Sequence, residues 1–218
     1  MNYSLQSPPV NSVQQTIRES ILTHRIEQPI TGFHRRFELP DDEGVILDDG
    51  QYKYIVLNFS DVENLIHRDG TLLDVLEPNH VPVILGTEDD EILDERTLQD
   101  ELDLLTAAQP AIYVPDVVYN YKGMDDEIQQ RAIDAYLHHI RSLQHLINKS
   151  KITIRLLPTN KGWTFDHFSR YRDLYEELGY REIAFYAVQY TGGDAGNARR
   201  ILRTHISNAI AALDLENV

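Results

Sequence analysis

Short apolar runs alternate with longer amphipathic segments along most of the chain. Runs rich in β-branched and aromatic residues, which predict strands, cover residues 53–59, 81–85, 111–115, 152–157 and 183–188. Each run is followed by a helical pattern, and the runs recur every 30 to 40 residues or so, roughly as βα units require. Runs such as IAFYAV are apolar almost throughout, which indicates burial on both faces. The pattern therefore predicts an α/β fold with a parallel sheet.

The helices expected in the second half of the chain show a clear period. Apolar or aromatic residues between 125 and 148 recur as one stripe: Ile128, Ala132, Tyr136, Ile140, Leu143 and Ile147. A second stripe covers residues 168–178, and Gly179 follows it as a left-handed stop. A third stripe covers residues 198–213. The three stripes predict three helices.

The chain divides into an N-terminal arm and one α/β domain. Residues 1–32 hold a Pro-Pro pair and a short amphipathic helix over 13–24, and we expect the domain to cover residues 33–218. Asp49-Gly50 between two β-rich runs predicts a hairpin near the start of the domain. The sequence has no membrane-spanning run and its first residues do not have the pattern of a signal peptide, so we expect a cytoplasmic, soluble protein.

Composition narrows the classes of function. The chain has 35 acidic and 20 basic residues, no cysteine and a formal net charge of −15. Acid excess with arginine in place of lysine is the pattern expected of a protein that works at high salt. The charge argues against nucleic-acid binding that is independent of sequence, because such binding neutralises phosphates. The densest basic cluster, Arg199, Arg200 and Arg203, is read most simply as a solvated helix face, with a phosphate contact as the alternative.

No metal or cofactor is expected from the motifs. Without cysteine, disulfides and thiolate sites are excluded. The adjacent His138 and His139 cannot share a helix face, and His145 lies too far along the helix for one ion to bridge it to His138.

Candidate ligand-binding residues lie at the carboxyl ends of the predicted strands, where ligands bind in parallel α/β sheets. Asp116 ends the run AIYVPD, where it either accepts hydrogen bonds from a ligand or caps a turn in water. Tyr119 and Tyr121 follow, and aromatic rings beside an acid suit a flat heterocycle, although they also suit ordinary packing.

Two glycine-containing loops follow later strands. Lys161 and Gly162 lead into a helix, which suits either an anion at its free N–H groups or a plain βα turn. Gly192 and Gly193 allow close approach to a ligand, or a tight turn. Arg155 interrupts the apolar run ITIRLL and requires a partner, for which Asp116 is a candidate.

The order of these segments from about Thr97 to Leu213 resembles the tRNA-guanine transglycosylase superfamily, which includes relatives that insert 7-deazaguanines into DNA. The likeness comprises a helix, the strand AIYVPD with its terminal acid, a polar Tyr-containing loop, a long helix, the strand ITIRLL, and ELGYREIAFYAV. The resemblance implies an incomplete or atypical TIM-like barrel. It also implies that Asp116 recognises a guanine or 7-deazaguanine base, free or in DNA or tRNA. Tyr119, Tyr121, Gln189 and Tyr190 would line the pocket.

The chain departs from the family at the positions that carry the reaction. In place of the family's DSGG-like motif it has VILGTEDD, which offers Glu88 and Asp89 only as displaced candidates. The family's nucleophilic aspartate belongs to a strand that follows the last helix of the resemblance. This sequence ends at Val218, before such a strand. We therefore expect either base exchange with a nucleophile from an unmatched acid or a second chain, or a catalytically inactive subunit that serves assembly. The catalytic residues are not identified by the sequence.

Overall fold

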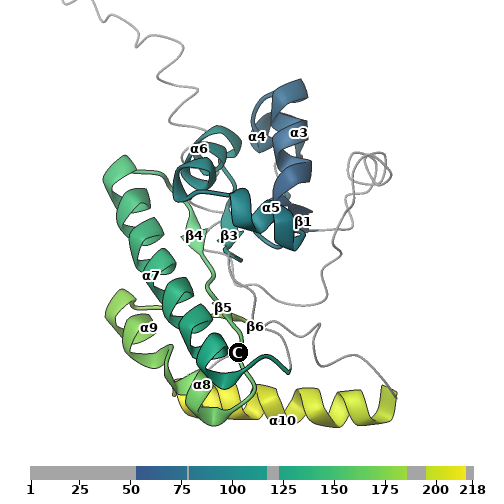
Figure 1. Cartoon of the computed structure of the whole chain (residues 1–218). Helices are drawn as coiled ribbons and strands as arrows, with labels where there is room; N and C mark the ends of the chain where they lie inside the picture. The colour runs from purple at the N-terminus through teal and green to yellow at the C-terminus, as the bar shows by residue number, and fades with distance from the viewer. Residues whose placement is uncertain (1–52, 78, 117–122, 186–194, 215–218) are drawn as a thin grey trace, which may run out of the picture.

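The fold is an α/β arrangement of parallel strands and helices. The computed structural model describes residues 53–77, 79–116, 123–185 and 195–214. Within these ranges helices separate most successive strands, as the sequence predicts, although two short strands follow one another without a helix between them (Figure 1). The predicted arm over 1–32, its helix and the hairpin at Asp49-Gly50 lie outside the described residues.

The described strands form two parallel sheets. The strands are β1 (Tyr54–Asn58), β2 (Val81–Leu85), β3 (Ile112–Val114), β4 (Arg155–Leu156), β5 (Thr159–Asn160) and β6 (Ala184–Phe185). The first sheet has four strands in the order β1-β2-β3-β4, and β5 pairs with β6 in the second. Every pairing is parallel, with Tyr54 opposite Val81 in the first pair. The strands therefore follow one another in chain order across each sheet.

One segment of chain joins the two sheets. β4 pairs with β3, and β5, which begins three residues after β4, pairs with β6. Between them, the backbone N–H of Leu157 donates to the Tyr113 carbonyl at 2.9 Å, and Pro158 accepts from the N–H of Ala184 at 2.8 Å. Pro158 has no N–H of its own and cannot extend the pairing with β3. Within the described residues the sheet is open, and a closed barrel is not shown.

The helices lie between successive strands and after the last one. They are α3 (Phe59–Asp69), α4 (Leu72–Val75), α5 (Asp90–Glu95), α6 (Leu98–Ala108), α7 (Asp126–Ser150), α8 (Phe165–Ser169), α9 (Arg172–Leu178) and α10 (Ala195–Leu213). The predicted stop at Gly179 is confirmed, with φ of 73° in the left-handed region. The single helix predicted over 168–178 is wrong. Thr164 starts α8 earlier, because its side chain accepts from the N–H of His167, and the chain then breaks before α9.

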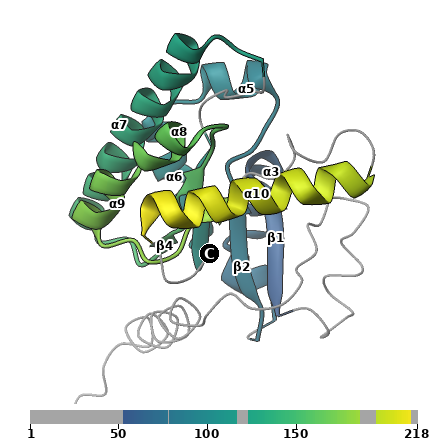
Figure 2. The same ribbon diagram turned by 90° about the horizontal axis from the view of Figure 1, so that it is seen from below.

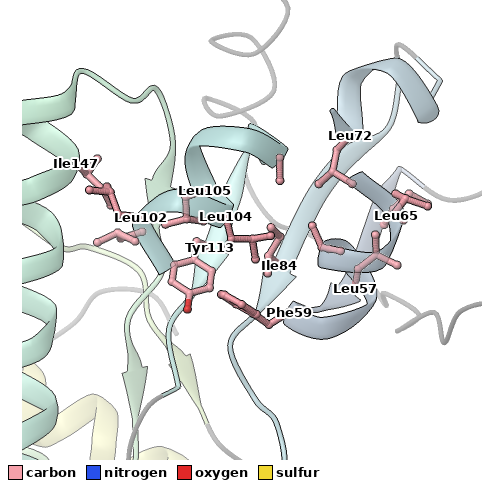
Figure 3. Close-up of a cluster of buried hydrophobic side chains, with 14 of the residues drawn as sticks. Leu57, Phe59, Leu65, Leu72, Ile84, Leu102, Leu104, Leu105, Tyr113 and Ile147 are labelled. Atoms are coloured by element: carbon pink, nitrogen blue, oxygen red, sulfur yellow. The ribbon is translucent and has the colours of Figure 1, made fainter. Parts of the chain in front are cut away.

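Both faces of the four-stranded sheet are apolar, as the sequence predicts. On one face, Leu57, Ile84 and Tyr113 pack with leucines of α6 and with Ile147 of α7 (Figure 3). On the other face, Tyr54, Val83 and Ile112 form a second cluster. Burial of these side chains supplies the main stabilising term of the sheet, at about 1.5 to 3 kcal/mol for each large apolar side chain. No helix in the described part of the chain combines the length and the hydrophobicity that a membrane span requires.

Candidate functional site

The carboxyl ends of the parallel strands bring polar residues together from distant parts of the chain. Gly86, Thr87 and Glu88 follow β2, Asp116 follows β3, and Lys161 follows β5. Because β2 and β3 are paired and parallel, their carboxyl ends lie at one edge of the four-stranded sheet, as the sequence predicts for Asp116, and Lys161, which follows β5 of the second sheet, contacts Asp116 there. We call this the carboxyl edge.

Asp116 is buried at this edge and held on both of its oxygens. Only 2% of the residue is exposed, so the alternative in which it caps a turn in water is wrong. Its Oδ2 accepts from the Thr87 hydroxyl at 2.9 Å, and its Oδ1 contacts the Lys161 ammonium group. The side chains of Lys161 and Asp116 are 7% and 3% exposed. Burying a carboxylate is costly unless it is paired, and this pairing with Lys161 and Thr87 offsets the cost.

Gly86 allows the chain to pass close to Asp116. Its N–H donates to the Val114 carbonyl at 2.8 Å, which extends the pairing beyond β2. A Cβ atom at position 86 would lie 2.7 Å from the backbone nitrogen of Asp116 and 2.9 Å from the hydroxyl oxygen of Tyr113. A side chain at position 86 would therefore displace the backbone that carries Asp116.

Buried tyrosines support the segment that carries Lys161. The Tyr171 hydroxyl donates to the Lys161 carbonyl at 2.9 Å, and the Tyr175 hydroxyl donates to the Thr159 carbonyl at 3.0 Å. The Tyr136 hydroxyl accepts from the Thr159 N–H at 2.6 Å and donates to the Pro115 carbonyl. Burial raises the pKa of Tyr136 and of Tyr175 well above the usual value. The hydroxyls therefore keep their protons and fix the position of Lys161 relative to Asp116.

Two amide side chains near the carboxyl edge have unused hydrogen-bonding groups. Asn160, which is fully buried next to Lys161, has neither its Oδ1 nor its Nδ2 in a hydrogen bond within the described part of the chain. At the end of β1, the Oδ1 of Asn58 is also buried and unpaired there. Buried polar groups are normally paired, so an unpaired amide of this kind is a candidate for ligand contact. Neither residue could be singled out from the sequence, because burial cannot be read from TNKG or LNFS.

A second buried polar cluster lies beside the first. Glu101 on α6 is fully buried, and its two oxygens contact the Tyr113 hydroxyl and the His139 Nε2, each at 2.5 Å. Burial raises the pKa of Tyr113 well above its usual value, and the neighbouring Glu101 carboxylate raises it further. Arg96 donates to the Gly86 carbonyl at 2.6 Å, and its charge partly opposes the rise in the pKa of Tyr113. The cluster explains His139 without a metal ion.

Arg155 has a different partner from the one considered in the sequence. Its Nη1 lies 3.1 Å from Glu182 Oε2, while Asp116 is paired with Lys161, so the suggested Arg155 and Asp116 pair is wrong. The two residues belong to neighbouring strands but lie at different positions along them. Arg155 begins β4, whereas Asp116 follows the end of β3. A pocket of about 400 Å³ lies beside Arg155 and is also lined by Tyr180, Arg181 and Gln144.

The remaining predicted residues divide into three groups. Tyr119, Tyr121, Gln189, Tyr190, Gly192 and Gly193 lie outside the described residues. Gly162 is buried against His167 and Phe168, where a Cβ would lie 2.7 Å from the Cβ of His167, so it serves close packing. Glu88 accepts from the Ser60 N–H at 2.8 Å near the start of α3, and Asp89 stands at the N-cap position of α5. No group of three or more metal-ligating side chains occurs among the described residues.

The chain matches no family model and no curated protein.

Proposed function

We propose that the chain binds a guanine or 7-deazaguanine base at the carboxyl edge, with Asp116 as the residue that reads it. The observation that carries the proposal is a buried carboxylate at a strand end, paired with Lys161 and oriented by the hydrogen bond from Thr87. Such a group is suited to accept hydrogen bonds from the N–H groups of a flat heterocycle.

Two acceptor sites of the Asp116 carboxylate are left for hydrogen bonds from a base. An ionised carboxylate offers about four lone-pair sites, and Lys161 and Thr87 use one on each oxygen. The two remaining sites suit the ring N–H and the exocyclic amine of guanine, which lie side by side on the Watson–Crick edge. The Asn160 amide next to Lys161 supplies a further donor and acceptor, and we include it in the binding site.

The resemblance to transglycosylases extends the proposal to base exchange at a glycosidic carbon, in DNA or tRNA. Such a reaction requires a nucleophile and a general acid or base. Glu88 is a candidate for proton transfer, although its Oε1 already accepts from the Ser60 N–H. The nucleophile would come from an acid that the family pattern does not identify, or from a second chain. The binding proposal does not depend on this step.

The second candidate function is that of a catalytically inactive subunit on the same scaffold. It is favoured by the Asp116 and Lys161 pair itself, because an internal ion pair satisfies the carboxylate without any ligand. Under this alternative, light scattering of the protein purified from its native source finds a complex with another protein and the chain binds no base, whereas the first proposal requires that the chain itself binds a base.

Thermal unfolding with added base tests the binding proposal. Guanine or 7-aminomethyl-7-deazaguanine at a hundred times its dissociation constant stabilises the folded state by about 2.7 kcal/mol. For a chain of this size that amounts to a rise in Tm of about 5 to 11 °C. Adenine, which presents a different edge, is expected to give no rise.

Two variants separate recognition by Asp116 from general effects of charge. Asp116→Asn removes the charge and two acceptor sites and is expected to abolish the rise in Tm caused by the base. Asp173→Asn, on the exposed surface of α9, makes the same chemical change and should keep the full rise. Circular dichroism verifies that both variants fold. A rise that persists in folded Asp116→Asn, or no rise with any of these bases in the natural sequence, contradicts the proposal.

A further inference from the structure

Arg155 has hydrogen-bond donors that its partner Glu182 does not use. Its Nη1 lies 3.1 Å from Glu182 Oε2, in an ion pair whose side chains are 23% and 44% exposed. Its Nε and Nη2 are buried and have no hydrogen-bond partner in the portion of the chain that the structure describes. Buried N–H groups are normally paired, and an unpaired one is costly. Arg155 therefore has two donors left for an acceptor that the described residues do not supply.

The Arg155 side chain lines a pocket of about 400 Å³. The walls come from residues 154–157 around β4, residues 179–182 after α9, and Gln144 of α7. Both views of the molecule show α7, α9 and β4 together on one side, with β1 on the other (Figures 1 and 2). The volume is within the range that small-molecule ligands occupy in proteins.

The pocket is separate from the carboxyl edge that holds Asp116. Arg155 begins β4 and stands opposite Ile112, the first residue of β3. Asp116 follows Ile112 by four residues, which is about 13 Å along an extended chain. The proposed function therefore makes no use of this pocket.

The charge of the pocket is opposite to that of the whole chain. Arg155 and Arg181 line it with a single acid, Glu182, in a protein whose net charge is −15. Ile154 and Leu157, which are partly buried, add apolar surface to the walls. The described walls thus combine one net positive charge with apolar side chains.

We propose that this pocket binds the carboxylate group of a small organic acid, with Arg155 as the residue that recognises it. The Nε–H and one Nη2–H leave the same edge of the guanidinium plane as parallel donors, and they match the two oxygens of a carboxylate. The pair with Glu182 uses the other nitrogen, and a partly exposed pair holds a guanidinium only weakly. The flexible stem of Arg155 can therefore turn this edge into the pocket, where Ile154 and Leu157 contact the organic body of the acid.

A phosphate group fits the pocket less well than a carboxylate. A phosphate monoester carries about −1.5 to −2 charges at neutral pH, which exceeds the net charge of Arg155, Arg181 and Glu182 together. Inorganic phosphate also has no apolar part to cover Ile154 and Leu157. A carboxylate with a short apolar body matches both the charge and the walls.

NMR of the nitrogen-labelled protein tests the inference, with benzoate, phenylacetate and hexanoate as probes. The Arg155 Nε–H signal, identified by its loss in Arg155→Lys, should shift as phenylacetate is added up to about 10 mM, where a ligand of millimolar Kd is mostly bound. Phenylacetamide keeps the ring and has no charge, so it should cause no such shift. In the natural sequence, contacts between the phenylacetate ring and the methyl groups of Ile154 or Leu157 locate the ligand without any variant.

Three variants separate recognition by the Arg155 donors from a general effect of charge. Arg155→Lys keeps the charge and loses the parallel donors, so it should weaken phenylacetate binding by about 10- to 150-fold, the value of one hydrogen bond to a charged group. Arg170→Lys makes the same change in an arginine that is paired with the exposed Asp134, and it should leave the affinity within about twofold. Glu182→Gln removes the acid of the pocket and should not weaken binding. Circular dichroism verifies that each variant folds.

The outcomes separate this inference from the proposed function. Binding of phenylacetate should persist in Asp116→Asn, and the rise in Tm with guanine should persist in Arg155→Lys. The inference is overturned if none of the three acids shifts the Arg155 signal or contacts the methyl groups, or if phenylacetamide binds as tightly as phenylacetate. Equal losses in Arg170→Lys and Arg155→Lys, loss of binding in Glu182→Gln, or tighter binding of inorganic phosphate than of any of the acids also overturns it.

Discussion

Replacing Lys161 with methionine tests whether Asp116 is held as a buried anion. Methionine keeps most of the length of the lysine side chain and removes its charge and its hydrogen bonds. Asp116 would then keep its bond from Thr87 and lose its only described counter-ion. The perturbation leaves a carboxylate uncompensated in a site where the two side chains are 3% and 7% exposed.

The size of the expected loss in stability follows from this burial. Removing one partner of a buried ion pair costs about 3 to 5 kcal/mol, whereas an exposed pair is worth about 1 kcal/mol or less. For a chain of this length, a loss of 3 to 5 kcal/mol lowers Tm by about 6 to 20 °C. The exposed pair of Arg141 and Glu177 on α7 and α9 offers the comparison, and Arg141→Met should lower Tm by no more than about 4 °C.

Urea denaturation monitored by circular dichroism measures the loss. The double variant Lys161→Met/Asp116→Leu removes both charges and should be more stable than Lys161→Met alone. A loss below about 1 kcal/mol in Lys161→Met, or a double variant less stable than the single one, refutes the buried anion.

Two further predictions follow from the same region. Gly86→Ala should destabilise the fold by about 1 to 3 kcal/mol, because the added Cβ would lie 2.7 Å from the Asp116 backbone nitrogen. Urea denaturation measures this loss, and an unchanged midpoint of unfolding contradicts the close approach. At alkaline pH, burial holds the pKa of Tyr113, Tyr136 and Tyr175 above the unfolded value of 10.0. The stability that this difference contributes is fully present below about pH 10 and is lost as the pH rises further, so unfolding and tyrosinate absorbance should appear together. Tyrosinate absorbance that develops for every tyrosine while the protein stays folded contradicts the burial.

The regular parts of the fold could be predicted from the sequence because their signals are local. The apolar runs at 81–85 and 111–115 contain β2 and β3, and the stripe between 125 and 148 lies within α7. The stop at Gly179 depends on one residue that adopts the left-handed conformation readily. The break between α8 and α9 was missed, because the hydrophobic period continues across it while the Thr164 cap and the backbone turn set the ends.

The candidate site was only partly predictable because its contacts are long-range. The position of Asp116 at a strand end follows from the run AIYVPD, but its partner Lys161 is 45 residues away along the chain. Arg155 and Lys161 were both candidate cations, and only the three-dimensional placement of β4 and the loop after β5 assigns Glu182 to the first and Asp116 to the second. Thr87 and Asn160 could not be singled out, since a threonine or an asparagine at the end of a strand is usually read as part of a turn.

A calorimetric titration with two bases tests the central claim that the Asp116 carboxylate reads a guanine-like edge. Hypoxanthine keeps the ring N–H of guanine and lacks the exocyclic amine. If Asp116 accepts from both groups, hypoxanthine should bind about 10- to 150-fold more weakly, the value of one hydrogen bond to a charged group. Asp116→Asn should give no heat of binding with either base. Equal affinity of the natural sequence for the two bases, or no heat of binding with guanine, would contradict the account.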